Sequence, residues 1–223
     1  MNKISNYMRL SIEDRDKMDI SDDQLFYQQP RYVHHLSFSF RDRLSKLYSN
    51  YLCNHHVILD LMSSWVSHLP SNTKYKKIIG HGMNESELKA NDRLDSYWVQ
   101  NLNKTQNMPI EDSSVDVALI VAGWQYLQYP ENVSLELSRI LKNESLLIIS
   151  FTNRAFWTKA PNIWTNSSEE RRIEYVKNVL ASNGWSIERV FNEKTYENKL
   201  FGFYSLESDP FFSVIARNNK SNN

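Results

Sequence analysis

The sequence predicts an α/β domain in which a mainly parallel seven-stranded sheet carries helices on both faces. Seven short apolar segments have the length and composition of strands, and segments with helical periodicity separate nearly all of them. The strongest strand candidate, residues 115–123, is rich in β-branched side chains and ends in glycine. With 223 residues, of which 41% are hydrophobic, the chain is long enough to bury one such core.

The seven expected strands are short apolar runs, and the first of them contains an aspartate close to its end. They are predicted at residues 55–61, 76–82, 97–101, 115–123, 145–151, 184–191 and 211–217. Alternation of such strands with helices implies parallel pairing. Ligands of parallel sheets bind at the carboxyl ends of the strands, so the segments to inspect follow Leu61, His81, Gln100, Val121 and Phe151.

Three helices are expected from apolar residues that recur at three- and four-residue steps. Pro130 suits the first turn of the second helix, where its missing N–H is not needed. Ser168 is a favourable N-cap for the third helix, and Gly184 follows its end. These helices are predicted at residues 36–51, 130–141 and 168–181.

The chain divides by composition into one domain and two flanking segments. Residues 1–24 are polar and charged and are expected to form a flexible arm. The domain is predicted over residues 25–217, with a helical lid at residues 25–51. Residues 218–223 form an asparagine-rich tail that is expected to be disordered.

The charge balance excludes several classes of partner. The 26 basic and 26 acidic residues cancel, which argues against a nucleic-acid-binding or membrane-binding surface and favours a small-molecule partner. Cys53 is the single cysteine, so no disulfide framework is possible. The N-terminus has no apolar run of signal-peptide length, and the expected location is cytoplasmic. His55 and His56 lack nearby ligand partners, so no metal site is expected.

The clearest candidate for a ligand site follows the first strand. Residues 57–70 read as an apolar strand containing Asp60, then a loop with Met62, Ser63 and Ser64, then a short helix. In nucleotide-cofactor sites this order lets backbone amides approach the ligand, while the acid accepts polar hydrogens. Taken alone, the pattern fits equally well an Asp60 that caps a helix beside solvated serines.

Several segments in this order resemble a divergent branch of the class I S-adenosylmethionine-dependent methyltransferases, related to the type 11 methyltransferases. The resemblance runs from about Leu25 to Arg217 and implies a three-layer Rossmann-like methyltransferase fold, S-adenosyl-L-methionine as cofactor and methyl transfer to an unidentified, small-molecule acceptor. It is carried by the strings FYQQPRYVHHL, DLMSSWVSHLP, IIGHGMNESEL, YWVQNLN, MPIEDSSVDVALIVAGWQYL, SFTNRAFWTKAPNIW and SDPFFSVIAR.

The resemblance also implies which residues contact the cofactor. Gly82 stands where most relatives place the acid that binds the ribose hydroxyls, and Asn84, Glu85 or His81 are the candidates to replace that acid. Asn101 stands where relatives often place an aspartate, and its amide oxygen can accept the same hydrogen bond from adenine. The implied cofactor-binding residues are Asp60, Met62, Ser63, Ser64, Gly82, Met83, Asn101, Leu102 and Ala122.

The acceptor is expected at the mouth of the same site. Methyl transfer from a sulfonium is an in-line displacement in which proximity and orientation supply much of the rate, so no catalytic base is assigned. His34 and His68 are titratable candidates, but packing roles are favoured for both. The expected acceptor-binding residues are Tyr27, Arg31, Tyr32, His34, Trp124, Gln125, Tyr126, Asn153 and Arg154.

Two other functions are compatible with parts of the pattern. A non-catalytic domain could keep the fold and bind a ligand or a protein, because the cofactor loop has lost its glycines and Gly82 replaces the ribose acid. A nicotinamide-dependent oxidoreductase shares the strand-loop start. It ranks last because it needs a glycine-rich turn and an acid roughly 20 residues further on, where Gly82 stands.

Overall fold

The protein folds around one mixed sheet, seen in a computed structural model that describes residues 9–194 and 209–220. Within these residues seven strands pair in the order β3-β2-β1-β4-β5-β7-β6. The first five are parallel, and β7 runs antiparallel to both β5 and β6. The strands are β1 Val57–Leu61, β2 Lys77–Gly82, β3 Ser96–Val99, β4 Val115–Val121, β5 Leu141–Phe151, β6 Trp185–Glu193 and β7 Phe211–Asn218.

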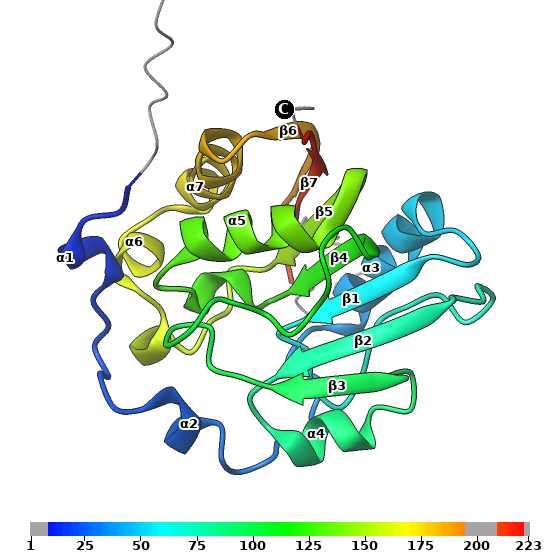
Figure 1. The fold of residues 1–223 in the computed structure, drawn as a ribbon. Coiled ribbons are helices and arrows are strands. Elements are labelled where there is room, and N and C mark those ends of the chain that lie inside the picture. Colours follow the sequence, from blue (N-terminus) through cyan, green and yellow to red (C-terminus); the bar gives the residue numbers. More distant parts are fainter. Residues whose placement is uncertain (1–8, 195–208, 221–223) are drawn as a thin grey trace, which may run out of the picture.

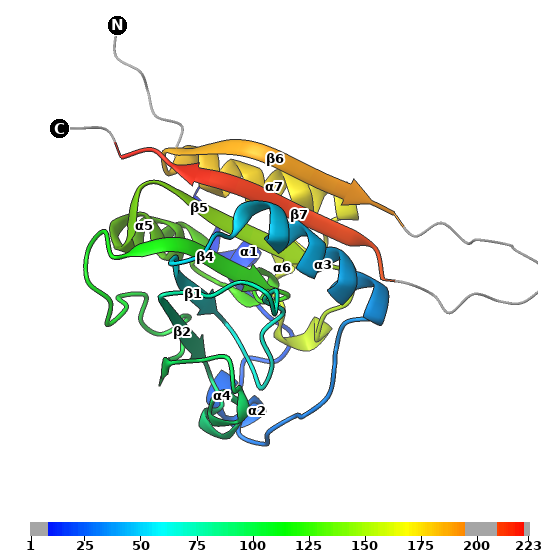
Figure 2. The same cartoon turned by 90° about the vertical axis from the view of Figure 1, so that its right-hand side faces the viewer.

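Helices cover both faces of this sheet, so the predicted three-layer fold is confirmed (Figures 1 and 2). The α5 and α7 helices lie on one face, and α3 lies on the other. The helices are α1 Ile12–Arg15, α2 Asp23–Phe26, α3 Phe38–Tyr51, α4 Glu85–Ala90, α5 Pro130–Ile140, α6 Asn162–Thr165 and α7 Glu169–Ser182, with single 3₁₀ turns at Trp124–Tyr126 and Trp157–Lys159.

The sheet buries a separate apolar layer on each face. Alternate side chains of a strand point to opposite faces. On β1, Leu59 therefore packs into the larger core with α5 and α7, whereas Ile58 packs into the smaller core under α3. Because β1 and β4 are buried on both faces, their sequences are continuous apolar runs rather than alternating ones.

Local sequence signals set most helix ends. Pro130 occupies the start of α5, and the Ser168 hydroxyl accepts from the Arg171 N–H at the start of α7. Gly184 takes a φ of 86° directly after α7, a conformation that glycine adopts without strain. The short α4 helix, which was not predicted, begins with an N-cap bond from the Glu87 N–H to the Asn84 side chain.

The prediction of a flexible arm over residues 1–24 is wrong for residues 9–24, which pack against the domain. Leu10 is buried, and Arg15 forms an ion pair of 2.5 Å with Glu131 on α5. The charged residues that suggested disorder are the ones that dock the segment. Their partners lie far away in the sequence, so the local sequence does not reveal these contacts. Residues 1–8 lie outside the described residues.

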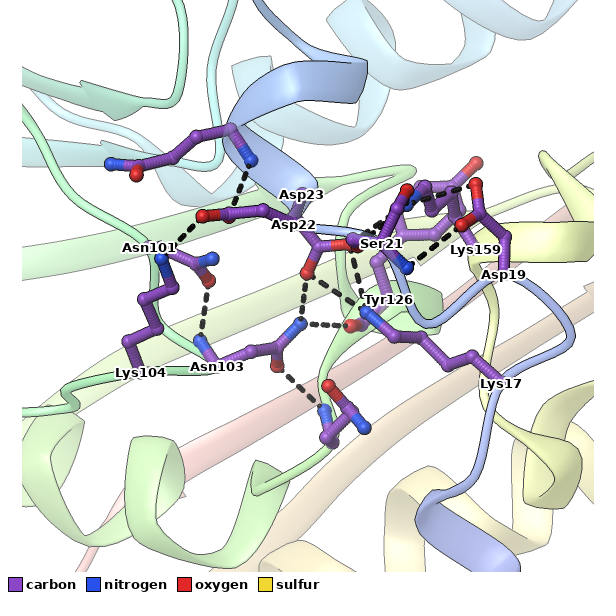
Figure 3. Close-up of polar contacts among 12 residues, drawn as sticks. Lys17, Asp19, Ser21, Asp22, Asp23, Asn101, Asn103, Lys104, Tyr126 and Lys159 are labelled. Atoms are coloured by element: carbon purple, nitrogen blue, oxygen red, sulfur yellow. Dashed lines mark hydrogen bonds and ion pairs between the residues drawn. The ribbon is translucent and has the colours of Figure 1, made fainter.

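A group of polar residues, which we call the clamp, holds the end of this segment (Figure 3). The clamp consists of Lys17, Ser21, Asp23, Asn103 and Lys159. Lys17 Nζ lies 2.8 and 2.9 Å from the two carboxylate oxygens of Asp23. Lys159 Nζ donates to the carbonyl and the hydroxyl of Ser21, each at 2.9 Å, and Asn103 Nδ2 donates to Asp23 at 3.1 Å. The clamp therefore joins the N-terminal segment to the loops that follow β3 and β5.

The other predicted boundaries also shift in the structure. The lid expected at residues 25–51 is helical at its two ends, in α2 and α3, and extended in between. The predicted tail begins too early, because Asn218 is the buried last residue of β7. Its side chain donates to the Ser138 carbonyl at 3.0 Å and accepts from the Ser138 hydroxyl at 2.8 Å. Residues 221–223 lie outside the described residues.

Two kinds of feature are missing from the described residues. No helix there is long and apolar enough to cross a membrane. The same residues contain no cluster of three or more histidine, cysteine, aspartate or glutamate side chains with the arrangement of a metal site.

Removing the central carboxylate of the clamp should destabilise the fold. We expect Asp23→Ala to lower the free energy of unfolding by about 3 to 5 kcal/mol, because the Lys17 ammonium loses its partner in a buried site. Urea unfolding measures this change. The control is Asp42→Ala, which removes an exposed pair with Lys46 and should cost at most about 1 kcal/mol. Equal losses in the two variants would contradict a buried clamp.

Candidate functional site

A cavity of about 490 Å³ opens at the carboxyl ends of the parallel strands. It lies beside β1 and β4, where the strand order reverses, which is the usual place for ligands in such sheets. Its volume falls in the range of small-molecule and cofactor sites. The segments after β1, β2, β3, β4 and β5 form its walls, and the N-terminal lid and α3 close one side.

The segment between β1 and β2 corrects one prediction. A short helix was expected after Ser64, but residues 62–76 contain no helix. Side chains replace the helical hydrogen bonds here: Ser67 donates to Asp60, and Asn91 Nδ2 donates to the Ser64 carbonyl and the Ser67 hydroxyl, both at 3.0 Å. Local bonds of this kind compete with helix formation. The expected helix N-terminus is therefore not part of this site.

Asp60 lies at the floor of the cavity and is buried. One of its carboxylate oxygens accepts from the Ser63 hydroxyl at 2.8 Å and from the Ser67 hydroxyl at 2.5 Å. Burial raises the pKa of Asp60, and the two hydroxyl bonds oppose that rise. The strand-end acid is thus held by the two serines of its own loop.

His81 on β2 holds the loop that follows β1. Its Nδ1 accepts from the Met62 N–H at 3.2 Å, and its carbonyl accepts from the Ser63 N–H at 2.6 Å. Because Nδ1 is an acceptor, Nε2 carries the proton and donates to the Gln100 carbonyl at 3.0 Å. Burial lowers the pKa of His81 to about 4, so the ring is neutral near pH 7.

Close backbone approach explains the two glycines beside this loop. A Cβ atom at Gly82 would lie 2.6 Å from the Ser63 carbonyl oxygen, so no side chain fits where relatives carry an acid. A Cβ atom at Gly123 would lie 2.7 Å from the Met62 Cβ. Met62 itself takes a φ of 59°, the conformation for which a loop glycine is usual. The loop keeps a glycine-like bend without a glycine.

The bend leaves the cavity open. Met62 packs partly into the core, and Trp65 turns toward the lid, where its indole N–H donates to the Val33 carbonyl at 3.2 Å. All nine residues that the sequence assigned to the cofactor line the cavity: Asp60, Met62, Ser63, Ser64, Gly82, Met83, Asn101, Leu102 and Ala122.

Six of the nine predicted acceptor residues line the same cavity, namely Tyr27, Arg31, His34, Gln125, Tyr126 and Arg154. The other three do not. Tyr32 and Asn153 are not among the residues that line the cavity, although their neighbours on either side are. Trp124 is buried in the larger core, because the 3₁₀ turn directs it inward. These three residues do not line the cavity, and their acceptor-binding role stays a prediction.

The sequence missed other residues of the cavity wall. Tyr48 on α3 is buried and lies opposite Asp60, whose charge adds to the effect of burial in raising the pKa of Tyr48. Glu87 on α4 accepts from the Ser64 hydroxyl at 2.5 Å and from the Arg31 N–H at 2.7 Å. A tyrosine on the apolar face of the predicted helix was the available signal for Tyr48. Glu87 gave no signal because α4 was not predicted.

Three polar atoms of the wall have no partner among the described residues, which fits a polar ligand; one of them is the Arg41 Nε atom. The Tyr48 hydroxyl and the Gln125 Oε1 atom are shielded from solvent and form no hydrogen bond among the described residues. Gln125 uses only its Nε2 group, which donates to the Arg154 carbonyl at 3.4 Å. Unpaired buried groups cost free energy, so a ligand that supplies partners would bind here with a gain.

Comparison with known proteins identifies the domain. Residues 64–149 match the family model for a methyltransferase domain of type 11. This segment of the chain is similar to methyltransferase domains of that type. The match confirms the predicted resemblance to class I S-adenosylmethionine-dependent methyltransferases, and it spans the cavity segments after β1 to β4 of this methyltransferase domain. No curated protein matches the chain in sequence.

Solved structures share the fold of this methyltransferase domain. A candidate methyltransferase from Haloferax volcanii, in complex with the Trm112 methyltransferase activator, is 12% identical over 82% of this chain and 93% of its own, with a TM-score of 0.60. An S-adenosylmethionine-dependent methyltransferase from Archaeoglobus fulgidus is 14% identical over 79% and 92%, with a TM-score of 0.57. The [4+2]-cyclase SpnF is 12% identical over 81% and 82%, with a TM-score of 0.55. At these identities the likeness establishes the fold.

The buried neutral His81 should make the stability of the methyltransferase domain depend on pH. The folded-state pKa, about 4, lies below the unfolded value of 6.5, so the unfolded chain binds the proton first and stability falls as pH drops between these values. We expect this group to contribute about 3 kcal/mol to the fall.

Urea unfolding at several pH values, with wild type and His81→Gln, measures that contribution as a difference in slope. The exposed His55 provides the control variant, His55→Asn, which should keep the wild-type slope. An unchanged slope in His81→Gln would mean that His81 is not the neutral residue that holds the loop.

Proposed function

We propose that this protein transfers a methyl group from S-adenosylmethionine to a small-molecule acceptor in the cytoplasm. The observation that carries the proposal is the cavity at the β1–β4 switch point, which brings together the nine residues assigned to the cofactor. Six of them lie within the matched residues 64–149, and Asp60, Met62 and Ser63 come directly before that match. Its unpaired buried polar atoms and its volume support a ligand that is both polar and large.

The residues of the floor would hold the amino-acid and nucleoside parts of the cofactor. Asp60 offers its second carboxylate oxygen, since Ser63 and Ser67 both bond to the other one. Asn101 uses its side-chain oxygen to accept from the Asn103 N–H at 2.9 Å and keeps one lone pair for an amino group. Leu102 and Met83 provide apolar surface beside them.

Glu87 is the carboxylate best placed to replace the acid missing at Gly82. It lines the same cavity, and the bonds from Ser64 and Arg31 hold its two oxygens while leaving each with a free lone pair. None of the three earlier candidates is as suitable. Asn84 holds the lid by donating to the Tyr27 carbonyl at 2.8 Å, His81 holds the loop, and Glu85 is exposed.

The chemistry would need little more than orientation. The cofactor supplies a methyl group on a sulfonium, and displacement requires the acceptor atom to lie in line with the bond that breaks. Gln125, Tyr126 and Arg154 surround the acceptor side and can donate or accept hydrogen bonds that orient it. Burial lowers the pKa of His68 to about 4, so this ring is neutral near pH 7 and can form a hydrogen bond with the acceptor.

Binding of S-adenosylhomocysteine, measured by calorimetry, tests the cofactor assignment. We expect the wild type to bind it and Glu87→Gln to bind about 10 to 100 times more weakly, because the variant loses charge-assisted bonds to the ribose hydroxyls. Glu85→Gln is a matched control on the same helix and should bind like the wild type. A wild type that shows no binding at millimolar concentrations would rule out the proposal.

Labelled methyl transfer separates catalysis from binding alone. SpnF, a cyclase with a similar fold, illustrates that this architecture is not limited to one reaction. We expect radioactive methyl groups from labelled cofactor to appear on a small-molecule fraction of a cell extract. A Ser63→Trp variant, whose larger side chain fills the cavity floor, should abolish that signal. Equal labelling by the two proteins, or none by either, would favour a non-catalytic domain.

A further inference from the structure

The cations that line the cavity differ in whether they have partners. The Arg154 side chain lies 2.6 Å from the Asp209 carboxylate, and Lys159 belongs to the clamp. Arg31 donates to the Phe26 carbonyl at 2.8 Å. Arg41 differs from these three: within the described part of the chain its guanidinium has no hydrogen bond and no ion pair, and its Nε atom is shielded from solvent.

Among the described residues, no acid pairs with Arg41. Two histidines face it, His34 from the lid and His68 from the loop after β1, and its charge lowers the pKa of both in addition to the effect of burial. From its own helix, the Phe38 ring lies 5.8 Å away. The nearby acid of α3, Asp42, pairs with Lys46 at 2.7 Å. A partly buried guanidinium among neutral groups leaves its donors unpaired, which is costly unless an anion arrives.

We infer that Arg41 binds a carboxylate at the lid end of the cavity. A guanidinium matches a carboxylate with two parallel N–H bonds, and the neutral imidazoles of His34 and His68 can add bonds without repelling the anion. The inference rests on the proposed function and specifies it. The carboxylate has two possible sources there, the amino-acid end of the cofactor and an acidic acceptor.

Two nucleosides test whether the amino-acid end of the cofactor supplies the carboxylate. S-adenosylhomocysteine carries the amino-acid carboxylate, whereas 5′-methylthioadenosine lacks the amino-acid group. We expect Arg41→Met to weaken binding of S-adenosylhomocysteine about tenfold or more while leaving 5′-methylthioadenosine unaffected, because a charge-assisted pair is lost. Arg43→Met, two residues along α3 and outside the cavity wall, should change neither affinity. This result assigns Arg41 to the cofactor carboxylate.

Benzoate tests whether an acidic acceptor supplies the carboxylate. Added to protein saturated with S-adenosylhomocysteine, it should bind saturably, as followed by tryptophan fluorescence from Trp65, whose ring lies 4.9 Å from that of His34. Loss of this binding in Arg41→Met, with S-adenosylhomocysteine affinity retained, assigns Arg41 to the acceptor carboxylate. If Arg41→Met matches the wild type for both nucleosides and for benzoate, the inference is overturned.

The same measurements separate this inference from the proposed function. If the wild type binds neither nucleoside, the cofactor assignment fails. Benzoate binding to the free protein that disappears in Arg41→Met and persists in Arg43→Met would then still support an anion site at Arg41. The absence of such binding would reject the site as well.

Discussion

The pairing of His81 with the loop after β1 is the interaction on which the site depends. One imidazole accepts from the Met62 N–H and donates to the Gln100 carbonyl, so it connects the ends of β1, β2 and β3. These are three walls of the cavity. The connection requires a neutral ring, and burial provides one by lowering the pKa of His81. A loop without glycines thus keeps a fixed bend because the His81 side chain accepts from the Met62 N–H and the His81 carbonyl accepts from the Ser63 N–H.

Polar contacts of other kinds hold the remaining walls. Glu87 joins α4 to the lid and to the β1 loop, and the clamp around Asp23 joins the N-terminal segment to the loops after β3 and β5. Buried charged groups are costly to bring together, and a partial set is worse than none. The walls should therefore be rigid when complete and should loosen together when one contact is broken. This arrangement makes the N-terminal segment a structural part of the cavity.

The sequence predicted the sheet well because strands that are buried on both faces are recognisable as short apolar runs. β1, β4 and the second half of β5 are mostly apolar, and Pro130 and Ser168 mark helix starts through local chemistry. It failed where long-range bonds override local preference. Residues 62–76 contain no helix because Asp60 and Asn91 bind the serines, and Asn91 lies more than 20 residues away from Ser64 and Ser67.

Sequence order and composition alone determined the α/β class and the strand-end acid Asp60, since both depend on periodicity or on strand ends. The cofactor-binding residues came from the resemblance to a known family. Tertiary structure alone decided how these groups are used. It showed that Gly82 admits no side chain because the Ser63 carbonyl lies against it, and that Trp124 belongs to the core. It also showed that Arg41 lines the cavity without a partner among residues 9–194 and 209–220. These facts depend on distances between segments far apart in the chain, which local patterns do not encode.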